Sequence, residues 1–342
     1  MRFAVLRTGA QAANALHIGA GGRIVAVFSN TFYANLGQAL VCIGGNALTA
    51  GPLNVISQAP TGIDWGANGL RVGDHVQMSP GHLHVAGGLI FSWADAEIWT
   101  PPAAPSDWSL HTLREGLDEL NRLAAGRIPD QGLGYTTLSD KPDASTIVSD
   151  FAFNPIRHFR NWVRRSLVGR TSDPPETLRP ETLCKVVPLL GLGPGLTPSG
   201  DDFLGGAMIV LHYLAQRAVV HPIASMIRQF AEGATTPISV AHLAAAAEGQ
   251  GSMQLHEAIN GIVGGKQEIN DDHLSALDRI GHCSGWDALA GAVMVLWIWL
   301  EIEEAAEKRS VHVANKGMTL RRSIENGCGA GARRQSRGAS PA

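Results

Sequence analysis

The chain of 342 residues has few cysteines, few charged residues and no long apolar segment. Its four cysteines, Cys42, Cys184, Cys283 and Cys328, are scattered and form no CxxC pair, which favours reduced thiols over a disulfide framework or a zinc site. The longest apolar run, 288–300, is shorter than the ~20 residues that a membrane span needs. The N-terminus has no apolar stretch of the signal-peptide kind. We therefore expect a cytoplasmic protein with reduced thiols and no membrane partner.

Charged residues make up only 17% of the chain and hydrophobic residues 45%, a balance that favours a folded protein with a sizeable core. The net charge of −3 is unevenly spread. Residues 308–342 hold eight Lys or Arg and one Glu, a net of +7, so the preceding residues carry −10. An acidic body gives no support for nucleic-acid binding. The basic tail has few apolar residues and is predicted to be disordered.

Residues 1–100 are predicted to form β structure. Short runs rich in β-branched or aromatic residues recur along this part, separated by Gly, Pro and Asn, and two further runs alternate polar and apolar residues. The expected strands are 23–28, 39–43, 53–56, 70–78, 82–85 and 87–91. This pattern is typical of a small antiparallel β-barrel or sandwich.

The sequence changes to helical periodicity after Pro101 and Pro102. Regularly spaced leucines predict a helix over 106–125, and Pro155 is expected at the first position of a second helix. Further helices are expected at 181–190, 202–219, 221–232, 238–248, 253–263, 272–280 and 287–306. The predicted fold class is α+β, with a β-rich domain (1–100), a helical connecting region (101–180), an α-helical domain (181–306) and a disordered basic tail (307–342).

Two stretches that lie 85 residues apart, 197–211 and 282–296, are identical at eight of fifteen positions. Each stretch begins as a loop and continues as an apolar helix. The repeat contains a glycine, Gly206 in one copy and Gly291 in the other, that is expected to let two helices approach closely.

Both copies of the repeat also contain the pattern Ser-Gly-x-Asp. This pattern predicts a capping box, in which Ser199 pairs with Asp202 and Ser284 pairs with Asp287. Helix capping is the main alternative to a functional role for these four residues.

The loop 191–202, with the sequence GLGPGLTPSGDD, is the candidate functional centre. Glycine is entropically costly to order, and consecutive backbone N–H groups in such a turn can bind an anion. Two carboxylates at the helix start oppose an anion placed directly on the helix. The pattern therefore favours a small ligand whose anionic end meets the Gly193–Thr197 amides and whose NH2 end meets Asp201. A second loop, 235–239, carries three hydroxyl groups and is expected either to cap its own helix or to complete the same pocket.

The segment 193–204 resembles the signature of a bacterial protein family whose named member is the AllH subunit of oxamate carbamoyltransferase. The loop 235–239 and the block 284–287 also resemble that family, and the resemblance extends over about 1–305. Cys283 departs from the family pattern, which has a small or hydroxyl residue at this position.

The resemblance implies a role in purine and allantoin catabolism. The complex of that family converts oxalurate and phosphate into oxamate and carbamoyl phosphate and works with separate partner subunits. A small anionic carbamoyl-type metabolite and other protein subunits are therefore the expected partners. No cofactor is required by the pattern, although Mg²⁺ or another cation beside Asp201 stays open.

Carbamoyl transfer needs a polarised carbonyl group and a bound phosphate, which oriented hydrogen-bond donors can supply. The candidate catalytic residues are Asp201 and Thr197. The candidate ligand-binding residues are Gly193, Gly195, Leu196, Ser199, Gly200, Asp202, Thr235, Thr236, Ser239, Ser284 and Asp287. The sequence shows no spacing typical of a nucleophilic triad, a metal site or a Walker A loop. It leaves two hypotheses open: a catalytic carbamoyltransferase subunit, or a non-catalytic subunit that binds a metabolite and docks to the catalytic chain.

Overall fold

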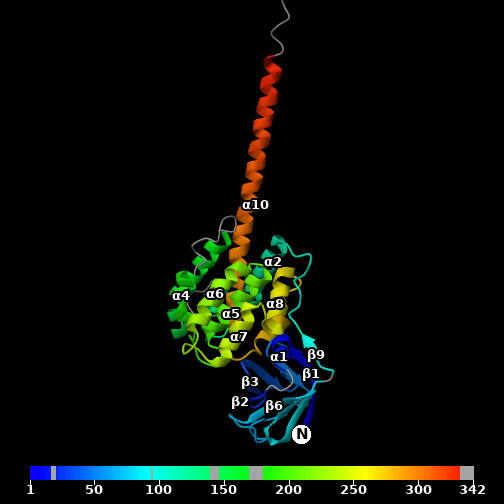
Figure 1. Ribbon diagram of the computed structural model, residues 1–342. Coiled ribbons are helices and arrows are strands. Elements are labelled where there is room, and N and C mark those ends of the chain that lie inside the picture. The colour runs from blue at the N-terminus through cyan, green and yellow to red at the C-terminus, as the bar shows by residue number, and fades with distance from the viewer. Residues whose placement is uncertain (17–20, 94, 139–145, 169–179, 332–342) are drawn as a thin grey trace, which may run out of the picture.

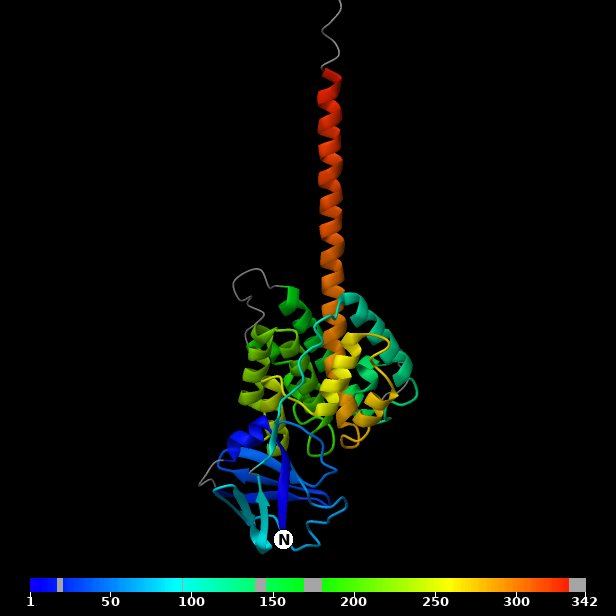
Figure 2. The same cartoon turned by 90° about the vertical axis from the view of Figure 1, so that its right-hand side faces the viewer.

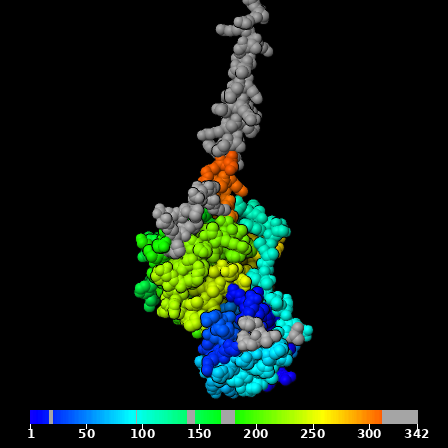
Figure 3. All heavy atoms as spheres, in the orientation of Figure 1, coloured from blue at the N-terminus to red at the C-terminus, as the bar shows by residue number. Residues whose placement is uncertain are grey.

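The computed structural model describes residues 1–16, 21–93, 95–138, 146–168 and 180–331, with the side chains of the last range described as far as Ser310. The chain forms a β-barrel domain followed by a helical domain. In Figures 1 and 2 the barrel lies below the helical domain. The same two parts form the lower and upper lobes of the space-filling view in Figure 3. The predicted fold class, a small barrel followed by a mainly helical part, is confirmed.

The barrel domain contains nine strands and a short helix. The strands are β1 (Arg2–Gly9), β2 (Gly21–Val27), β3 (Thr31–Leu36), β4 (Ala39–Gly44), β5 (Asn54–Ser57), β6 (His75–Ser79), β7 (His82–Val85), β8 (Leu89–Ser92) and β9 (Glu97–Trp99). Helix α1 (Ala10–Ala15) follows β1, and the 3-10 turn η1 (Ala86–Gly88) links β7 to β8. The strand order is β5-β4-β3-β2-β6-β7-β8-β1-β9, and an additional β5–β1 pairing closes the barrel. The pairings β1–β8, β1–β9 and β4–β5 are parallel, and the other pairings are antiparallel as expected.

Aromatic rings fill the centre of the barrel. Phe32, Trp65 and Phe91 are fully buried, with ring centroids 5.2 Å apart for Phe32 and Trp65 and 5.9 Å apart for Trp65 and Phe91. Burial of such large rings supplies much of the apolar area that stabilises a small barrel. The barrel therefore has a core of its own, separate from that of the helical domain.

The helical domain begins after β9. Its helices are α2 (Leu110–Ala124), α3 (Tyr135–Leu138), α4 (Ile147–Val168), α5 (Ser199–Tyr213), α6 (Arg217–Phe230), α7 (Pro237–Ala247), α8 (Met253–Gly264), α9 (Asp271–Leu277) and α10 (Ser284–Gly331). Two 3-10 turns, η3 (Pro180–Leu183) and η4 (Val187–Leu189), stand where the sequence predicts a helix over 181–190.

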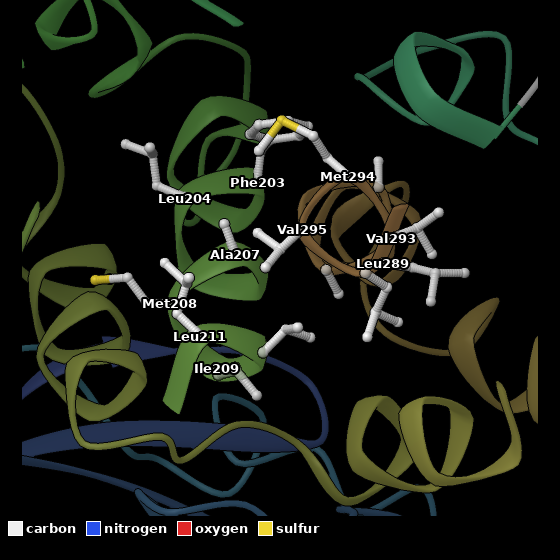
Figure 4. Packing of buried hydrophobic residues seen from close by; sticks show 14 of the residues in the cluster. Phe203, Leu204, Ala207, Met208, Ile209, Leu211, Leu289, Val293, Met294 and Val295 are labelled. Carbon is white, nitrogen blue, oxygen red and sulfur yellow. The ribbon is translucent and has the colours of Figure 1, made fainter. Parts of the chain in front are cut away.

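Helices α5 and α10 form the centre of this domain, and each begins with one copy of the repeat (Figure 4). A Cβ added at Gly206 would lie 1.8 Å from the carbonyl oxygen of Ala288, and one added at Gly291 would lie 1.9 Å from that of Phe203. Ala288 and Phe203 occupy the same position in their respective copies. Each glycine therefore packs against the backbone of the other copy, and the pair has an approximate two-fold symmetry. The predicted close approach of the two helices is confirmed.

The start of α4 differs from the prediction. The helix begins at Ile147, and Pro155 lies inside it rather than at its first position. Thr146 initiates the helix, because its side-chain oxygen accepts a 3.0 Å hydrogen bond from the Ser149 amide and its carbonyl accepts one of 2.9 Å from the Asp150 amide. Proline removes one backbone hydrogen bond from a helix interior. Burial of Pro155 against the core offsets that loss here.

Helix α10 extends to Gly331, into the segment for which the sequence predicts disorder, and projects from the domain in Figures 1 and 2. Its part from Ser284 to Ser310 is long and apolar enough to span a membrane by composition alone. However, 72% of that apolar window is buried inside the protein, which is the environment of a core helix.

Candidate functional site

The glycine-rich loop reaches α5 through three glycines with positive φ. Gly191, Gly193 and Gly195 have φ of 73°, 112° and 102°. A Cβ at Gly191 would lie 1.9 Å from the carbonyl oxygen of Ala234, so glycine is also required there by close packing. A Cβ at Gly195 would meet nothing within 4 Å, so only its backbone conformation requires glycine. The loop is open at Gly195 and closed at Gly191.

Asp201 joins this loop to the loop 235–239. Its Oδ1 accepts a 3.0 Å hydrogen bond from the Gly191 amide. Its Oδ2 accepts hydrogen bonds from the hydroxyls of Thr235 and Ser239, the latter at 2.7 Å. Both oxygens of this buried carboxylate therefore have protein donors, and the side chain fixes three segments relative to one another.

Thr236 makes a second connection between the same loops. Its side-chain oxygen accepts a 3.0 Å hydrogen bond from the Ser239 amide, which caps α7, and its hydroxyl donates to the carbonyl oxygen of Leu196. The loop 235–239 thus caps its own helix and also contacts the glycine-rich loop. Helix capping and a contribution to the pocket, which the sequence offered as alternatives for this loop, therefore occur together.

The polar residues of the two repeat copies pair across the copies instead of forming capping boxes. The N-cap of α5 is Pro198, and Ser199 lies inside the helix with its Oγ 3.7 Å from the Sγ of Cys283. The hydroxyls of Thr197 and Ser284 lie 3.0 Å apart. The predicted capping boxes are therefore wrong. The close approach of α5 and α10 offers these side chains nearer partners in the opposite copy than in their own.

Asp202 and Asp287 occupy the same position in the two copies, and each has an Oδ2 atom that is buried without a hydrogen-bond partner among the described residues. Burial raises the pKa of Asp202 well above its usual range, and the nearby charge of Asp287 adds to this effect. Hydrogen bonds from the hydroxyls of Ser284 and Thr197 oppose it. Burial also raises the pKa of Asp287. Two buried carboxyl groups with unpartnered oxygens are unusual, because such atoms are costly to desolvate.

The two carboxyl groups differ in access. Asp287 is fully buried, and its Oδ1 accepts a 2.5 Å hydrogen bond from the Leu133 amide. Gly132 has no side chain to block this approach, since a Cβ there would lie 2.4 Å from Asp287 Oδ1. The segment before α3 therefore seals Asp287, whereas Asp202 faces a cavity.

A cavity of about 680 Å³ lies between the barrel and the helical domain. Its walls come from the glycine-rich loop, the faces of α5 and α7, the loop before α10, and strands β3 to β5 with their connection. The polar or charged residues that line it are Thr31, Tyr33, Thr49, Asn54, Gln131, Thr197, Asp201, Asp202, Ser239, His242, Gln250, Ser252, Arg279, His282 and Ser284. Its size and its position between two domains are typical of a small-molecule site.

The cavity brings together about half of the residues that the sequence nominates. The nominated residues that line it are Gly195, Leu196, Thr197, Asp201, Asp202, Ser239 and Ser284. The other nominated residues lie behind this wall and contact it: Gly193, Ser199, Gly200, Thr235, Thr236 and Asp287. For example, the Gly200 amide donates a 2.9 Å hydrogen bond to the Leu192 carbonyl.

Several residues that line the cavity are not among those predicted from the sequence. His242 lies three residues after Ser239 on the same face of α7, a spacing that was visible in the sequence. Arg279 is the one Lys or Arg among the described residues that line the cavity, but nothing in its sequence surroundings marks it. Tyr33 and Asn54 come from the barrel, more than 100 residues before the loop, and had no local signal at all.

Two chemical alternatives find little support in this geometry. Burial, together with the nearby Asp287, raises the pKa of the Cys283 thiol to about 12, so this side chain is a poor nucleophile at neutral pH. Within the ranges that the structure describes, no group of three or more His, Cys, Asp or Glu side chains is placed to hold a metal ion.

The family comparison bears on the part of the chain that builds most of this site. Residues 189–296 match the family model of oxamate carbamoyltransferase subunit AllH. The match covers about a third of the chain. We call these residues the AllH segment. No curated protein and no solved structure matches the chain.

The AllH segment contains the glycine-rich loop, the loop 235–239 and both copies of the repeat. The resemblance recognised in the sequence is thereby confirmed for these residues. The match suggests a subunit of oxamate carbamoyltransferase in allantoin catabolism, and a subunit of such an enzyme implies other protein subunits. The barrel, which supplies the opposite wall of the cavity, lies outside the match.

Proposed function

We propose that the chain is a carbamoyltransferase subunit that binds a small anionic carbamoyl-type metabolite in the cavity between its domains. Together with partner subunits, it takes part in the conversion of oxalurate and phosphate into oxamate and carbamoyl phosphate, in the cytoplasm and within purine and allantoin catabolism. The proposal rests on the family match of the AllH segment and on the polar groups of the cavity.

The observation that carries the proposal is the presence of unpaired donors and unpaired acceptors in one cavity. Among the described residues, the amides of Gly195, Leu196 and Thr197 donate to no acceptor, and the Arg279 side chain has no ion-pair partner. The Asp202 Oδ2 and Gln250 Oε1 atoms are buried without a donor. An anionic group satisfies the donors and an NH2 group satisfies the acceptors, so one ureido acid satisfies both.

The cavity has the length for such a ligand. Asp202 and Ile209 both line it and are seven residues apart on α5, which corresponds to ~10 Å along the helix. Oxalurate is a short, extended molecule, and this length leaves room for a phosphate beside it. The lining residues of β3 and β5 then contact the ligand from the side opposite α5.

The alternative is a non-catalytic subunit that binds the metabolite and docks to the catalytic chain. One observation favours it: the two described cysteines of the cavity, Cys42 and Cys283, are not activated nucleophiles, because burial raises the pKa of each thiol to about 12. Carbamoyl transfer between two bound substrates needs no protein nucleophile, so we favour the catalytic subunit.

Calorimetric titration of the full chain with oxalurate, oxamate, carbamoyl phosphate and phosphate tests ligand binding. Gly195→Ala is expected to weaken binding at least tenfold, because the new side chain is strained at φ 102° and displaces the loop amides. Gly69→Ala is the matched control, since Gly69 has φ 93°, equally open surroundings and a place in the barrel away from the cavity.

Carbamoyl phosphate formation, measured for the chain with and without its partner subunits, separates the two hypotheses. Loss of activity in Gly195→Ala, with the partners still bound, supports the catalytic subunit. Binding of a ligand by the wild-type chain, together with full activity in Gly195→Ala, supports the docking subunit. Absence of both binding and activity with all four compounds would rule out the proposed function.

A further inference from the structure

The cavity lies between two complementary helix faces. Asp202, Gly205, Gly206 and Ile209 of α5 line it at positions i, i+3, i+4 and i+7. Ser239, His242, Leu243 and Ala246 of α7 line it at the same spacing. This spacing places each set on one face of its helix, so that both helix faces border the shared space.

Contacts between α5 and α7 place His242 and Asp202 on adjoining walls of the same cavity. Ser239 donates a 2.7 Å hydrogen bond to Asp201, and the position of a Cβ at Gly205 lies 3.7 Å from the Cβ of Ala246. His242 lies between Ser239 and Ala246 on α7. It is therefore level with the segment of α5 that begins at Asp202, and Gly205 contributes no side chain to fill the space between them.

Each group has a polar atom without a protein partner among the described residues. The imidazole of His242 has no hydrogen-bond partner among the described residues, and it lines the cavity while only partly exposed. The Asp202 Oδ2 atom is fully buried and also lacks a partner there. Buried polar atoms in native proteins nearly always have partners, so the Asp202 Oδ2 atom indicates that a bound molecule completes this part of the cavity, which the partly exposed His242 imidazole also lines.

Their protonation states at neutral pH follow from burial. Burial raises the pKa of Asp202 well above its usual range, which favours the protonated carboxyl group. Burial lowers the pKa of His242 to about 4, which favours the neutral imidazole. Opposite shifts in one site are typical of groups with separate acid and donor roles. The neutral Asp202 carboxyl group thus has one O–H donor and one accepting oxygen, and the neutral His242 imidazole has one N–H donor.

We propose that Asp202 is the general acid of the carbamoyl transfer and that His242 donates an N–H hydrogen bond to the carbamoyl oxygen. This inference rests on the proposed function. A phosphate oxygen attacks the carbamoyl carbon of oxalurate, and negative charge grows on the carbonyl oxygen beside His242. The C–N bond then breaks, and Asp202 gives its proton to the departing nitrogen, which leaves as the NH2 group of oxamate.

The protons balance within one turnover. Monohydrogen phosphate loses its proton on becoming the phosphoryl group of carbamoyl phosphate, and this proton restores the Asp202 carboxyl group. The new C–O bond replaces the C–N bond, and no oxidant, metal or covalent enzyme intermediate is required.

Other titratable groups face these two side chains. Asp201 and Asp287 add negative charge near Asp202, and Cys283 lies beside them with its thiol protonated. Arg279 and His282 line the same cavity from the loop before α10, and the Arg279 guanidinium supplies positive charge there. The pH profile of the reaction therefore reports a cluster in which, of the described carboxyl groups that line the cavity, Asp202 is the one with an oxygen that lacks a protein partner.

The test uses the full chain with its partner subunits and measures carbamoyl phosphate formation from oxalurate and phosphate. Asp202→Asn, which cannot supply a proton, is expected to lower kcat by about 100-fold or more with KM changed little. His242→Leu is expected to lower kcat by about 100-fold, and His242→Gln, which keeps an N–H donor, to recover at least tenfold of that loss. Asp118→Asn on α2 and His221→Leu on α6, both exposed and remote from the cavity, are the matched controls and should retain wild-type kcat.

The wild-type pH profile gives a readout without any substitution. Loss of the Asp202 proton should make kcat fall as the pH rises, and this decline should be absent in Asp202→Asn. A wild-type kcat that rises across pH 6–9, or Asp202→Asn and His242→Leu variants within threefold of wild type, would overturn this inference and leave the proposed function intact. A wild-type complex that transfers no carbamoyl group would overturn both. Thermal melts of every variant distinguish loss of folding from loss of chemistry.

Discussion

Substitution of Gly206 or Gly291 by alanine tests the reciprocal contact between the two repeat copies. A Cβ at Gly206 would lie 1.8 Å from a backbone oxygen of α10, and one at Gly291 would lie 1.9 Å from a backbone oxygen of α5. A carbon and a carbonyl oxygen in ordinary contact are ~3.3–3.6 Å apart, so α5 and α10 must separate by about 1.5 Å. Overpacking of this kind costs about 1–3 kcal/mol, or more where backbone must move.

The two costs should not add. One separation of about 1.5 Å makes room for both methyl groups, because each glycine faces the other helix at an equivalent position. We therefore expect each single variant to lose about 3 kcal/mol in free energy of unfolding, and the double variant to lose little more than either one.

Urea denaturation monitored by circular dichroism measures these free energies. Gly205→Ala is the matched control on the same helix, because its Cβ would make an ordinary 3.7 Å contact with Ala246. Alanine is favoured over glycine in a helix interior by about 1 kcal/mol, so this variant should be slightly more stable than wild type. Gly206→Ala as stable as Gly205→Ala, or a double variant whose loss is the full sum of the singles, would refute the reciprocal packing.

Three further predictions concern single side chains of the site. Asp201→Asn should lower the free energy of unfolding by about 1–3 kcal/mol, because the new amide NH2 group must face hydrogen-bond donors that now meet a carboxylate. An unchanged urea midpoint would show that the three hydrogen bonds of Asp201 do not support the fold. Asp287→Asn should gain stability relative to wild type as the pH rises above ~4. The pKa of Asp287 is raised on folding, so its contribution is lost as the pH rises from the unfolded value of ~3.9, and equal pH dependence of the two proteins would contradict this. In a chain with Cys184→Ser and Cys328→Ser, Cys283 should react with a disulfide reagent at pH 8 only after unfolding, and fast reaction of the native protein would show an exposed or ionised thiol.

The repeat and the glycine-rich loop were the parts of the site that the sequence could predict. The shared glycines of the repeat indicated a close helix pair, and Gly206 and Gly291 form it. The loop 235–239 was considered for the same pocket on its hydroxyls alone, and Asp201 connects it there. Such local patterns carry over to the structure because glycine and capping residues act on their own backbone.

The parts that the sequence could not predict depend on segments that are far apart in the chain. Asp287 receives its hydrogen bond from Leu133, which lies 154 residues before it. Strand β1 pairs with β8 and β5, and none of these contacts follows from its own residues. Tyr33 reaches the cavity only because the barrel packs against the helical domain. Local periodicity contains no information on such contacts, so the opposite wall of the site was invisible in the sequence.

The reciprocal glycine contact also limits how this protein can change by mutation. Most crowded side chains can be relieved by trimming a neighbour, but the atoms that face Gly206 and Gly291 are carbonyl oxygens of the main chain, which every residue type has. No second substitution at Ala288 or Phe203 therefore makes room for a larger residue. Evolutionary change at either glycine has to move a whole helix, and because α5 and α10 both begin at the cavity, it would alter the site at the same time.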